Sequence, residues 1–329
     1  MSDVDVPADN RPEERESSSL ADVEVVLVSY RSKDHVETLL STWPSSLRVV
    51  VVDNSHDVDQ LSELVERYPN VRYVDGGGQG FGRAANLGAL SSDQAIVLFV
   101  NPDSRPTAAD LAALADGVRG DDSALAHAAT TVGHDGAVEI GVGGWEPSPL
   151  RCLVHALGLH KRWPRAGMFA QPQLGQHEQV DWTSGACMAV TLARFRQVGG
   201  FDEAFFVYAE DLVLGRRAKS HGWQSVLRAD VVVKHDAGSS GAPSREMLRL
   251  RGASFAYYLK RYEPGWRGQL MRALFAVGCL LRVLSSALRR NQAQARLYQS
   301  YALGVITRRA FVNGEEVARK RFREIACQE

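Results

Sequence analysis

Few cysteines, little net charge and no long uninterrupted apolar run characterise this sequence of 329 residues. The four cysteines (Cys152, Cys187, Cys279 and Cys327) are far apart and lack zinc-ligand spacing, so neither a zinc site nor a disulfide framework is expected. Buried or idle thiols in a reducing compartment are the simplest interpretation. A formal net charge of −1 lacks the electrostatic footprint of a nucleic-acid-binding protein.

The first residues lack the apolar stretch of a signal peptide. They are acidic and rich in Pro, Ser and Glu, so we expect a disordered tail at 1–21. No segment reaches the uninterrupted apolar length that spans a bilayer, and the nearest, 270–288, is interrupted by Arg272 and Arg282. We therefore expect a cytoplasmic protein, and leave open a peripheral position at the inner face of the plasma membrane.

Short apolar runs alternate with helical patterns in the N-terminal third. Continuous apolar runs suit strands that are buried on both faces, and strand–helix alternation is typical of a doubly wound α/β sheet. The pattern predicts strands at 23–29, 48–52, 71–74 and 95–100, and helices at 33–42, 58–68, 81–90 and 108–118.

The pattern is lost over 133–177, a segment with many Gly, Pro, His and Trp residues. An irregular stretch of this length inside a compact domain indicates function or mobility, but its residues do not say which. Regular structure returns at Val180. Beyond it we expect helices at 192–197 and 210–220, a strand at 225–233, and helices dense in arginine and leucine from Ser244 onward.

Aspartates follow two of the expected strands, Asp53 after the second and Asp103 after the fourth. Ligands of open α/β sheets bind at the carboxyl ends of the strands. One such aspartate is ordinary turn chemistry, but two on the same sheet edge favour a polar site. Asp53 could accept a hydrogen bond from a nucleobase imide. Asp103 suits a hard divalent cation that bridges a diphosphate.

A glycine-rich stretch, 76–86, follows the third strand and opens a helix. Glycines let backbone amides approach phosphate, and a helix N-terminus favours anions. Gly80-x-Gly82-x-x-Ala85 also matches the loose dinucleotide fingerprint of NAD(P)-dependent oxidoreductases. That fingerprint normally follows the first strand of its unit, whereas two strand–helix units precede it here. A plain flexible turn explains the glycines equally well.

Glu210 and Asp211 lie at an expected helix start. Acidic residues there complement the helix dipole, so many such pairs are purely structural. The functional alternative is a general base that takes a proton from an acceptor hydroxyl. His235 follows the last expected strand, where a histidine is more often structural but can bind a metal through its neutral imidazole.

Together these stretches resemble the family-two glycosyltransferases, and most of all their rhamnosyltransferase branch. The resemblance implies a GT-A fold, which is an α/β fold with a Rossmann-like, mostly parallel central sheet. It places a nucleotide-binding half at 22–120, an acceptor half at 121–242 and a C-terminal helical extension at 243–329. The matching pieces occur in the family's order at 26–32, 51–55, 80–88, 99–103, 182–186, 199–203, 208–211 and 235–239.

The resemblance also implies an inverting, metal-dependent transferase with a nucleoside-diphosphate sugar donor and Mg²⁺ or Mn²⁺. The expected donor is dTDP-rhamnose, and the alternative is a UDP-sugar of GlcNAc, Gal or galactofuranose. The acceptor would be a glycan or a lipid-linked sugar in cell-envelope polysaccharide assembly.

The resemblance assigns roles to individual residues. Asp211 would be the catalytic base, Asp53 would contact the nucleobase, and Asp103 and His235 would hold the metal. The sequence departs from the family pattern in three places. It has Arg31 and Gly78 where the family usually has Asn, and its metal motif reads Asn101-Pro102-Asp103 where the family usually has two aspartates. The other donor contacts are expected at Ser29, Tyr30, Arg31, Gly80, Phe81, Arg83, Asn86 and Asn101, and the acceptor and sugar pocket at Trp182, Ser184, Gly185, Ala186 and Glu210.

The segment 267–290 is leucine-rich and has arginines at 267, 272, 282, 289 and 290. A packed helix with a charged outer face would explain this pattern. An interfacial helix that touches anionic lipid is the alternative, and it would suit a lipid-linked acceptor. The sequence does not indicate an oligomeric state.

Overall fold

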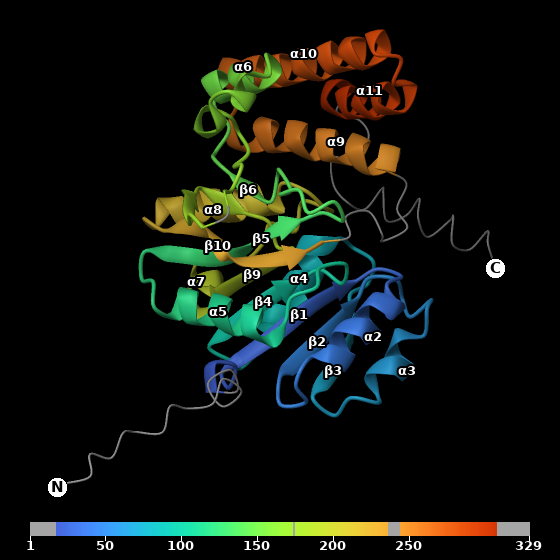
Figure 1. Ribbon diagram of the computed structural model, residues 1–329, viewed down its shortest axis with the longest axis vertical. Coiled ribbons are helices and arrows are strands. Elements are labelled where there is room, and N and C mark those ends of the chain that lie inside the picture. The colour runs from blue at the N-terminus through green and yellow to red at the C-terminus, as the bar shows by residue number, and fades with distance from the viewer. Residues whose placement is uncertain (1–17, 174, 236–243, 308–329) are drawn as a thin grey trace, which may run out of the picture.

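The computed structural model describes residues 18–173, 175–235 and 244–307. Most of the expected N-terminal tail therefore lies outside the described residues. The centre of the molecule is an eight-stranded sheet in the order β3-β2-β1-β4-β9-β5-β10-β7 (Figure 1). Its strands are β1 (Val23–Ser29), β2 (Arg48–Asp53), β3 (Val71–Asp75), β4 (Ile96–Val100), β5 (Ala124–Val132), β7 (Glu178–Val180), β9 (Cys187–Thr191) and β10 (Gln224–Lys234).

The sheet is mostly parallel, as the sequence predicts. Strands β1 to β4 run parallel to one another, and β5 runs parallel to β10. Strand β9 runs antiparallel to both β4 and β5 and so joins the two parallel groups. The sequence analysis predicts neither β5 nor β9, although both lie in the middle of the sheet. A small separate sheet pairs β6 (Gly143–Gly144) with β8 (Trp182–Thr183).

Helices cover both faces of the sheet because successive side chains of a strand point to opposite sides. On β1, Val25 and Leu27 pack with α2, α3 and α5, whereas Val26 packs with α4, α7 and α8. This arrangement confirms the predicted doubly wound α/β class. The helices are α2 (Lys33–Thr42), α3 (Leu61–Val65), α4 (Phe81–Leu90), α5 (Ala108–Arg119), α7 (Leu192–Gln197) and α8 (Glu210–Ser220).

Helix α3 is shorter than the predicted helix at 58–68. Gln60 has a left-handed backbone, with φ of 55°, which starts the helix only at Leu61. The Asp57 carboxylate accepts hydrogen bonds from the Ser62 amide and hydroxyl and holds the preceding residues in a turn. Residues 58–60 therefore form a turn held by the Asp57 carboxylate, although their sequence pattern is helical.

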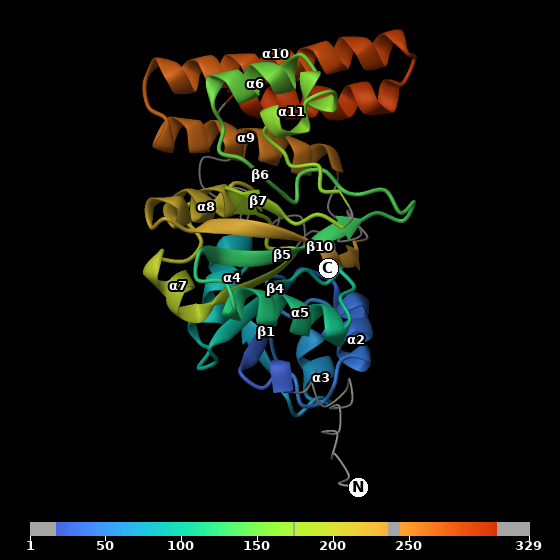
Figure 2. The same cartoon turned by 60° about the vertical axis from the view of Figure 1, so that its left-hand side comes forward.

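Three long C-terminal helices lie together above the sheet and confirm the predicted helical extension (Figure 1). A shorter helix from the irregular segment, α6, packs against α10 (Figure 2). One hydrophobic cluster joins Leu212 and Val213 of α8 to Tyr258, Met271 and other residues of these helices, so they share a core with the sheet domain. The helices are α6 (Pro149–Ala156), α9 (Ser244–Tyr262), α10 (Trp266–Leu288) and α11 (Gln292–Thr307).

Helix α10 corrects one sequence expectation. In the described part of the chain it is the one helix that is long and apolar enough, by length and composition, to cross a membrane. The sequence analysis had treated Arg272 and Arg282 as interruptions that exclude this. Membrane spans and packed core helices share this length and composition, and one face of α10, including Met271 and Phe275, is buried in the protein.

Candidate functional site

The carboxyl end of β4 meets the ends of two strands from the second half of the chain. The Asn101 amide donates to the Ala186 carbonyl at 2.8 Å, and the Ser104 hydroxyl donates to the same carbonyl at 3.0 Å. The Arg105 amide donates to the Lys234 carbonyl at 2.9 Å. The predicted metal motif is thus held between the start of β9 and the end of β10, where His235 lies.

Asp103 and His235 lie together, as the sequence predicts. His235 Nε2 is 3.3 Å from Asp103 Oδ1, and Nδ1 is 2.7 Å from Glu139 Oε2. Burial lowers the pKa of His235, but the two flanking carboxylates outweigh burial and raise it to about 10. The sequence analysis missed Glu139, which lies in the irregular segment and follows no motif.

A divalent cation fits this pair of side chains. His235 Nε2 is buried and faces the Asp103 carboxylate oxygen at 3.3 Å. A cation between them would take the place of the imidazole proton. Over the described ranges no group of three or more His, Cys, Asp or Glu side chains could hold a metal. Two protein ligands are enough for an ion whose other ligands are phosphate oxygens and water.

Asp53 ends β2, as the sequence predicts, and is held within the protein. Its side chain is fully buried, and both carboxylate oxygens accept hydrogen bonds from the protein. Oδ1 accepts from the amide and hydroxyl of Ser55, and Oδ2 accepts from the Asp57 amide and the Tyr73 hydroxyl. With these four hydrogen bonds made internally, the carboxylate shapes the turn after β2. Its contact with a nucleobase stays a prediction.

The glycine-rich loop serves close packing. Gly80 has a φ of 111°, and a Cβ there would lie 2.2 Å from the Phe206 carbonyl oxygen. The Phe81 amide donates to that same carbonyl at 2.7 Å, so the first amide of α4 is already satisfied. A Cβ at Gly82 would meet Phe201 at 3.2 Å. These glycines bring α4 against the 201–210 segment. They follow β3, an edge strand, whereas the dinucleotide fingerprint follows the first strand of its unit, so the position argues against a dinucleotide site.

Asn86 is likewise a structural residue. Its amide nitrogen donates to the Phe201 carbonyl and to Glu203, and its oxygen accepts from the Phe201 amide. The side chain is buried and holds the 201 segment. A donor contact of Asn86 stays a prediction. Arg83, on the same helix, is exposed.

The remaining expected donor contacts lie at the end of β1. Ser29 is fully buried, pairs in register with Asp53, and has a hydroxyl without a hydrogen-bond partner. Arg31 is exposed, has a left-handed backbone with φ of 51°, and places its guanidinium 5.8 Å from the ring of Tyr30. Tyr30 and Arg31 thus stand at the surface of the strand end that is expected to meet the nucleotide.

Glu210 and Asp211 begin α8 after two strained residues. Tyr208 and Ala209 both have left-handed backbones, with φ of 68° and 72°. Such conformations cost about 1–3 kcal/mol each for residues other than glycine and concentrate at functional sites. They turn the chain sharply, so that Asp211 lines a pocket while Glu210 is buried beside it.

The two carboxyl groups hold protons more tightly than ordinary ones. Burial raises the pKa of Asp211 to about 6, although the Leu212 amide and Arg251 act in the opposite direction. Burial, together with the charge of Asp211, raises the pKa of Glu210 well above its usual value. A carboxylate with a pKa close to neutral can remove a proton from a hydroxyl and release it again.

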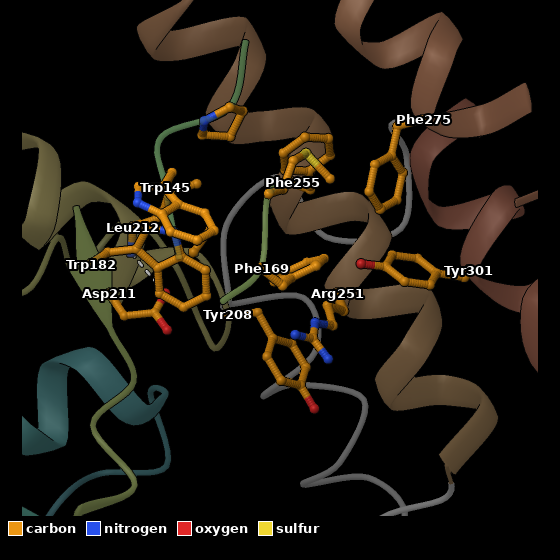
Figure 3. A pocket seen from close by; sticks show the side chains of 13 residues that line it. Trp145, Phe169, Trp182, Tyr208, Asp211, Leu212, Arg251, Phe255, Phe275 and Tyr301 are labelled. Atoms are coloured by element: carbon orange, nitrogen blue, oxygen red, sulfur yellow. Dashed lines mark hydrogen bonds between the residues drawn. The ribbon is translucent and has the colours of Figure 1, made fainter. Parts of the chain in front are cut away.

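The pocket beside Asp211 is largely aromatic. Its open volume, which extends into the surrounding solvent, is about 540 Å³, and Asp211 and Arg251 are its charged side chains. Figure 3 shows Trp182 next to Asp211, and Tyr208 next to Arg251. The lining comes from four parts of the chain: Trp145, Pro147, Met168 and Phe169 from the irregular segment, Trp182 from β8, Tyr208, Ala209, Asp211 and Leu212 around the start of α8, and Arg251, Phe255, Phe275 and Tyr301 from the C-terminal helices.

Of the residues expected to form the sugar and acceptor pocket, Trp182 lines this pocket, and the 184–186 turn does not. Trp182 lines it, with an indole nitrogen that is buried and unpartnered. Gly185 lies against the ring of Phe81, because a Cβ there would be 2.9 Å from that ring. Ser184 accepts a hydrogen bond from the amide of Ala186, which is buried. The 184–186 turn therefore lies between α4 and the end of β4, next to Asn101.

The residues contributed by α9, α10 and α11 were missed by the sequence analysis. Arg251, Phe255, Phe275 and Tyr301 lie at positions that read as ordinary helix residues. Only the stacking of these helices over the sheet domain brings them to Asp211. Nothing local in the sequence could have revealed them.

Comparison with known proteins agrees with this geometry. The family model described as Glycosyl transferase family 2 matches residues 24–169. The N-acetylglucosaminyl-diphospho-decaprenol L-rhamnosyltransferase of Mycobacterium tuberculosis is 31% identical over 300 residues, which cover 84% of this chain and 97% of that protein. Rhamnosyltransferase WbbL of Escherichia coli K12 is 25% identical over 214 residues, covering 61% of this chain and 78% of that protein.

A solved structure has the same fold. The mannosyltransferase from Pyrobaculum calidifontis, in complex with GDP-Man and Mn²⁺, superposes with a TM-score of 0.54 and 14% identity. The match covers 87% of this chain and 86% of that one. At this identity the likeness shows the fold, which is GT-A as the sequence predicts.

Proposed function

We propose that this chain, which belongs to the family-two glycosyltransferases, transfers a sugar from a nucleoside-diphosphate donor to a hydroxyl of a lipid-linked glycan. The observation that carries the proposal is Asp211, a carboxylate of raised pKa in an aromatic pocket. Residues 22–120 would supply the donor site, residues 121–242 the acceptor side, and the helices after 243 would close the pocket.

The reaction we propose is a direct displacement with inversion. The acceptor oxygen forms a bond to the anomeric carbon while the bond from that carbon to the diphosphate oxygen breaks. The acceptor proton passes to Asp211, and the nucleoside diphosphate leaves with the electron pair. Trp182 lies next to Asp211 in the pocket, where its ring would hold the reacting sugar and exclude water.

A divalent cation bound by Asp103 and His235, Mg²⁺ or Mn²⁺, would neutralise the charge that develops on the leaving diphosphate. The approach of the buried His235 Nε2 to the Asp103 carboxylate, at 3.3 Å, supports this assignment. The half-buried Tyr30 and the exposed Arg31 and Arg83 would contact the nucleotide. Asp53 would act indirectly by shaping the loop after β2.

For the donor we propose dTDP-rhamnose, because two relatives carry the name rhamnosyltransferase. A UDP-sugar of GlcNAc, Gal or galactofuranose remains the alternative. For the acceptor we propose a prenyl-diphosphate-linked sugar, following the name of the mycobacterial relative. Such a reaction belongs to cell-envelope polysaccharide assembly on the cytoplasmic side.

The acceptor class also supports a peripheral position at the membrane. Helix α10 exposes Val277, Leu281, Leu284 and Leu288 with fractions of 45–76%. Anionic lipid would be attracted by the exposed Arg289 and Arg290 at the end of the same helix. Arg282, by contrast, donates to the His155 carbonyl and ties α10 to α6. We therefore propose that this helix region lies on an anionic membrane surface.

A transfer assay tests the proposed function. We expect dTDP-rhamnose with Mn²⁺ to raise the melting temperature, and we expect rhamnose transfer to a short-chain prenyl-diphospho-GlcNAc. Asp211→Asn should keep the donor-induced shift but reduce kcat by about a hundredfold or more, because the base is lost. The matched control, Glu63→Gln, changes an exposed carboxylate of α3 and should leave kcat unchanged.

Each outcome separates the alternatives. Stabilisation by a UDP-sugar would replace the donor assignment, and stabilisation by NAD without any nucleotide-sugar would remove the transferase. Near-normal turnover of Asp211→Asn would remove that residue from the role of base.

A further inference from the structure

Arg251 is the cation of the pocket that contains Asp211. It lies on α9, in the part of the chain that follows the sheet domain. Its guanidinium carbon is 5.7 Å from the ring centre of Phe169 and 5.5 Å from that of Tyr208. The two rings hold the planar guanidinium within an aromatic wall, and this restricts its direction before any ligand binds.

In the described part of the chain, this guanidinium lies against the two rings and beside Gly141, and it makes no ion pair with a carboxylate. Arg216 provides a contrast, because its Nη1 lies 2.6 Å from both Glu146 and Glu263. The charge of Arg251 acts across the pocket and lowers the pKa of Glu210 and Asp211. An arginine with such surroundings still has its fork of N–H donors available to an anion.

We propose that Arg251 binds a phosphoryl group of the acceptor, adjacent to the sugar whose hydroxyl faces Asp211. This inference rests on the proposed function and adds the residue that recognises the acceptor class. Asp211 and Arg251 come from different elements and line one pocket, with Tyr208 beside the guanidinium (Figure 3). A sugar phosphate placed there presents its hydroxyl to the base and its anion to the arginine.

The donor diphosphate is the other source of such an anion. The pocket lining contains none of the expected donor residues at the ends of β1, β2 and β4, and it contains neither Asp103 nor His235. Its remaining walls are apolar and include Phe255 and Phe275 of the C-terminal helices. Apolar walls suit the start of a prenyl chain beyond the phosphate. These features assign the Arg251 anion to the acceptor.

Steady-state kinetics with two acceptors test the assignment. One is a short-chain prenyl-diphospho-GlcNAc, and the other is the neutral octyl glycoside of GlcNAc. We expect Arg251→Gln to raise KM for the diphosphate acceptor about ten- to a hundredfold, as for a lost charge-assisted hydrogen bond. The KM values for the donor and for the neutral glycoside should each change by less than about twofold, because neither compound places a phosphate on Arg251. A twofold change corresponds to roughly 0.4 kcal/mol of binding free energy.

Two control variants sharpen the test. Arg251→Lys keeps the charge but loses the bidentate fork, so it should give an intermediate KM. Arg249→Gln changes an exposed arginine of the same helix and should behave as the wild type. An equal loss with both acceptors would show that Arg251 acts only through the carboxylates, and a selective rise in the donor KM would give the anion to the donor. Either result overturns the proposal.

Direct binding distinguishes this proposal from the proposed function. If the wild type transfers no sugar, calorimetry with the same two acceptors still applies. Tight binding of the diphosphate compound that Arg251→Gln abolishes supports the subsite even without transfer. Equal binding of both compounds by wild type and variant contradicts it.

Discussion

At the scale of single residues, burial decides which carboxylates can act. Asp53 is buried with four hydrogen-bond donors and is thereby committed to its loop. Asp211 lines a pocket, and burial leaves it with a pKa of about 6. Both residues follow recognisable motifs in the sequence. Their different uses come from how many protein donors surround each carboxylate.

The raised pKa of Asp211 predicts an acidic limb in the pH profile. Asp211 must be ionised to accept a proton, so kcat/KM should fall as the pH drops through about 6. An ordinary aspartate would keep its activity to about pH 4. In Arg251→Gln the limb should move to higher pH, since a cation that favours the ionised form is gone. A limb near pH 4 in the wild type would contradict this role of burial.

The metal assignment makes a second residue-scale prediction. Asp103→Ala and His235→Gln should each abolish the Mn²⁺-dependent part of donor binding, because each removes one of two protein ligands. Glu139→Gln is the matched control, since it keeps both ligands and only weakens the orientation of the imidazole. Isothermal titration with donor, with and without Mn²⁺, measures the effect. Unchanged metal dependence in Asp103→Ala would remove Asp103 from the site.

At the scale of elements, short strained or glycine-bearing segments position the site. Gly80 lets α4 approach the Phe206 carbonyl, and Tyr208 and Ala209 turn the chain into α8. These segments bring the start of α8, with Asp211, next to the glycine-rich loop. The loop therefore contributes to the site through packing. A direct contact of Gly80 and Phe81 with the donor stays a prediction.

Helix α10 supplies the element-scale prediction. We expect the wild type to float with vesicles that contain phosphatidylglycerol, and the double variant Leu281→Glu and Leu284→Glu to lose most of this binding. Both leucines are exposed, so the fold should tolerate the change, which a melting curve checks. The control replaces Leu87 and Leu90, the exposed leucines of α4, by glutamate. Wild-type protein that stays off anionic vesicles would reject the membrane surface.

At the scale of the whole molecule, one sheet and one shared core unite the halves. Strand β9 joins the four parallel strands of the first half to β5 and β10 of the second. The cluster that contains Trp182, Leu212 and Phe275 continues from the sheet domain into the C-terminal helices. The pocket that contains Asp211 is formed at this junction. The helical extension therefore contributes side chains to the proposed active site.

Much of the fold was accessible from the sequence because its signals are local. Apolar runs of the length of β1, β2 and β4 are buried on both faces and show as continuous hydrophobic stretches. Strand β5 gave no such signal, since its Ala, His and Thr residues are buried without being strongly apolar. It is a strand because its neighbours β9 and β10 provide hydrogen-bond partners.

The sequence by itself determined the fold class, the order of the motifs, the pairing of Asp103 with His235, and the position of Asp211 at a helix start. These depend on strand ends and helix starts, which neighbouring residues specify. Only the tertiary structure decided that Asp53 and Asn86 are satisfied internally, that Glu139 flanks His235, and that Arg251 faces the pocket of Asp211. Those facts depend on contacts between residues far apart in the chain, which no local pattern encodes.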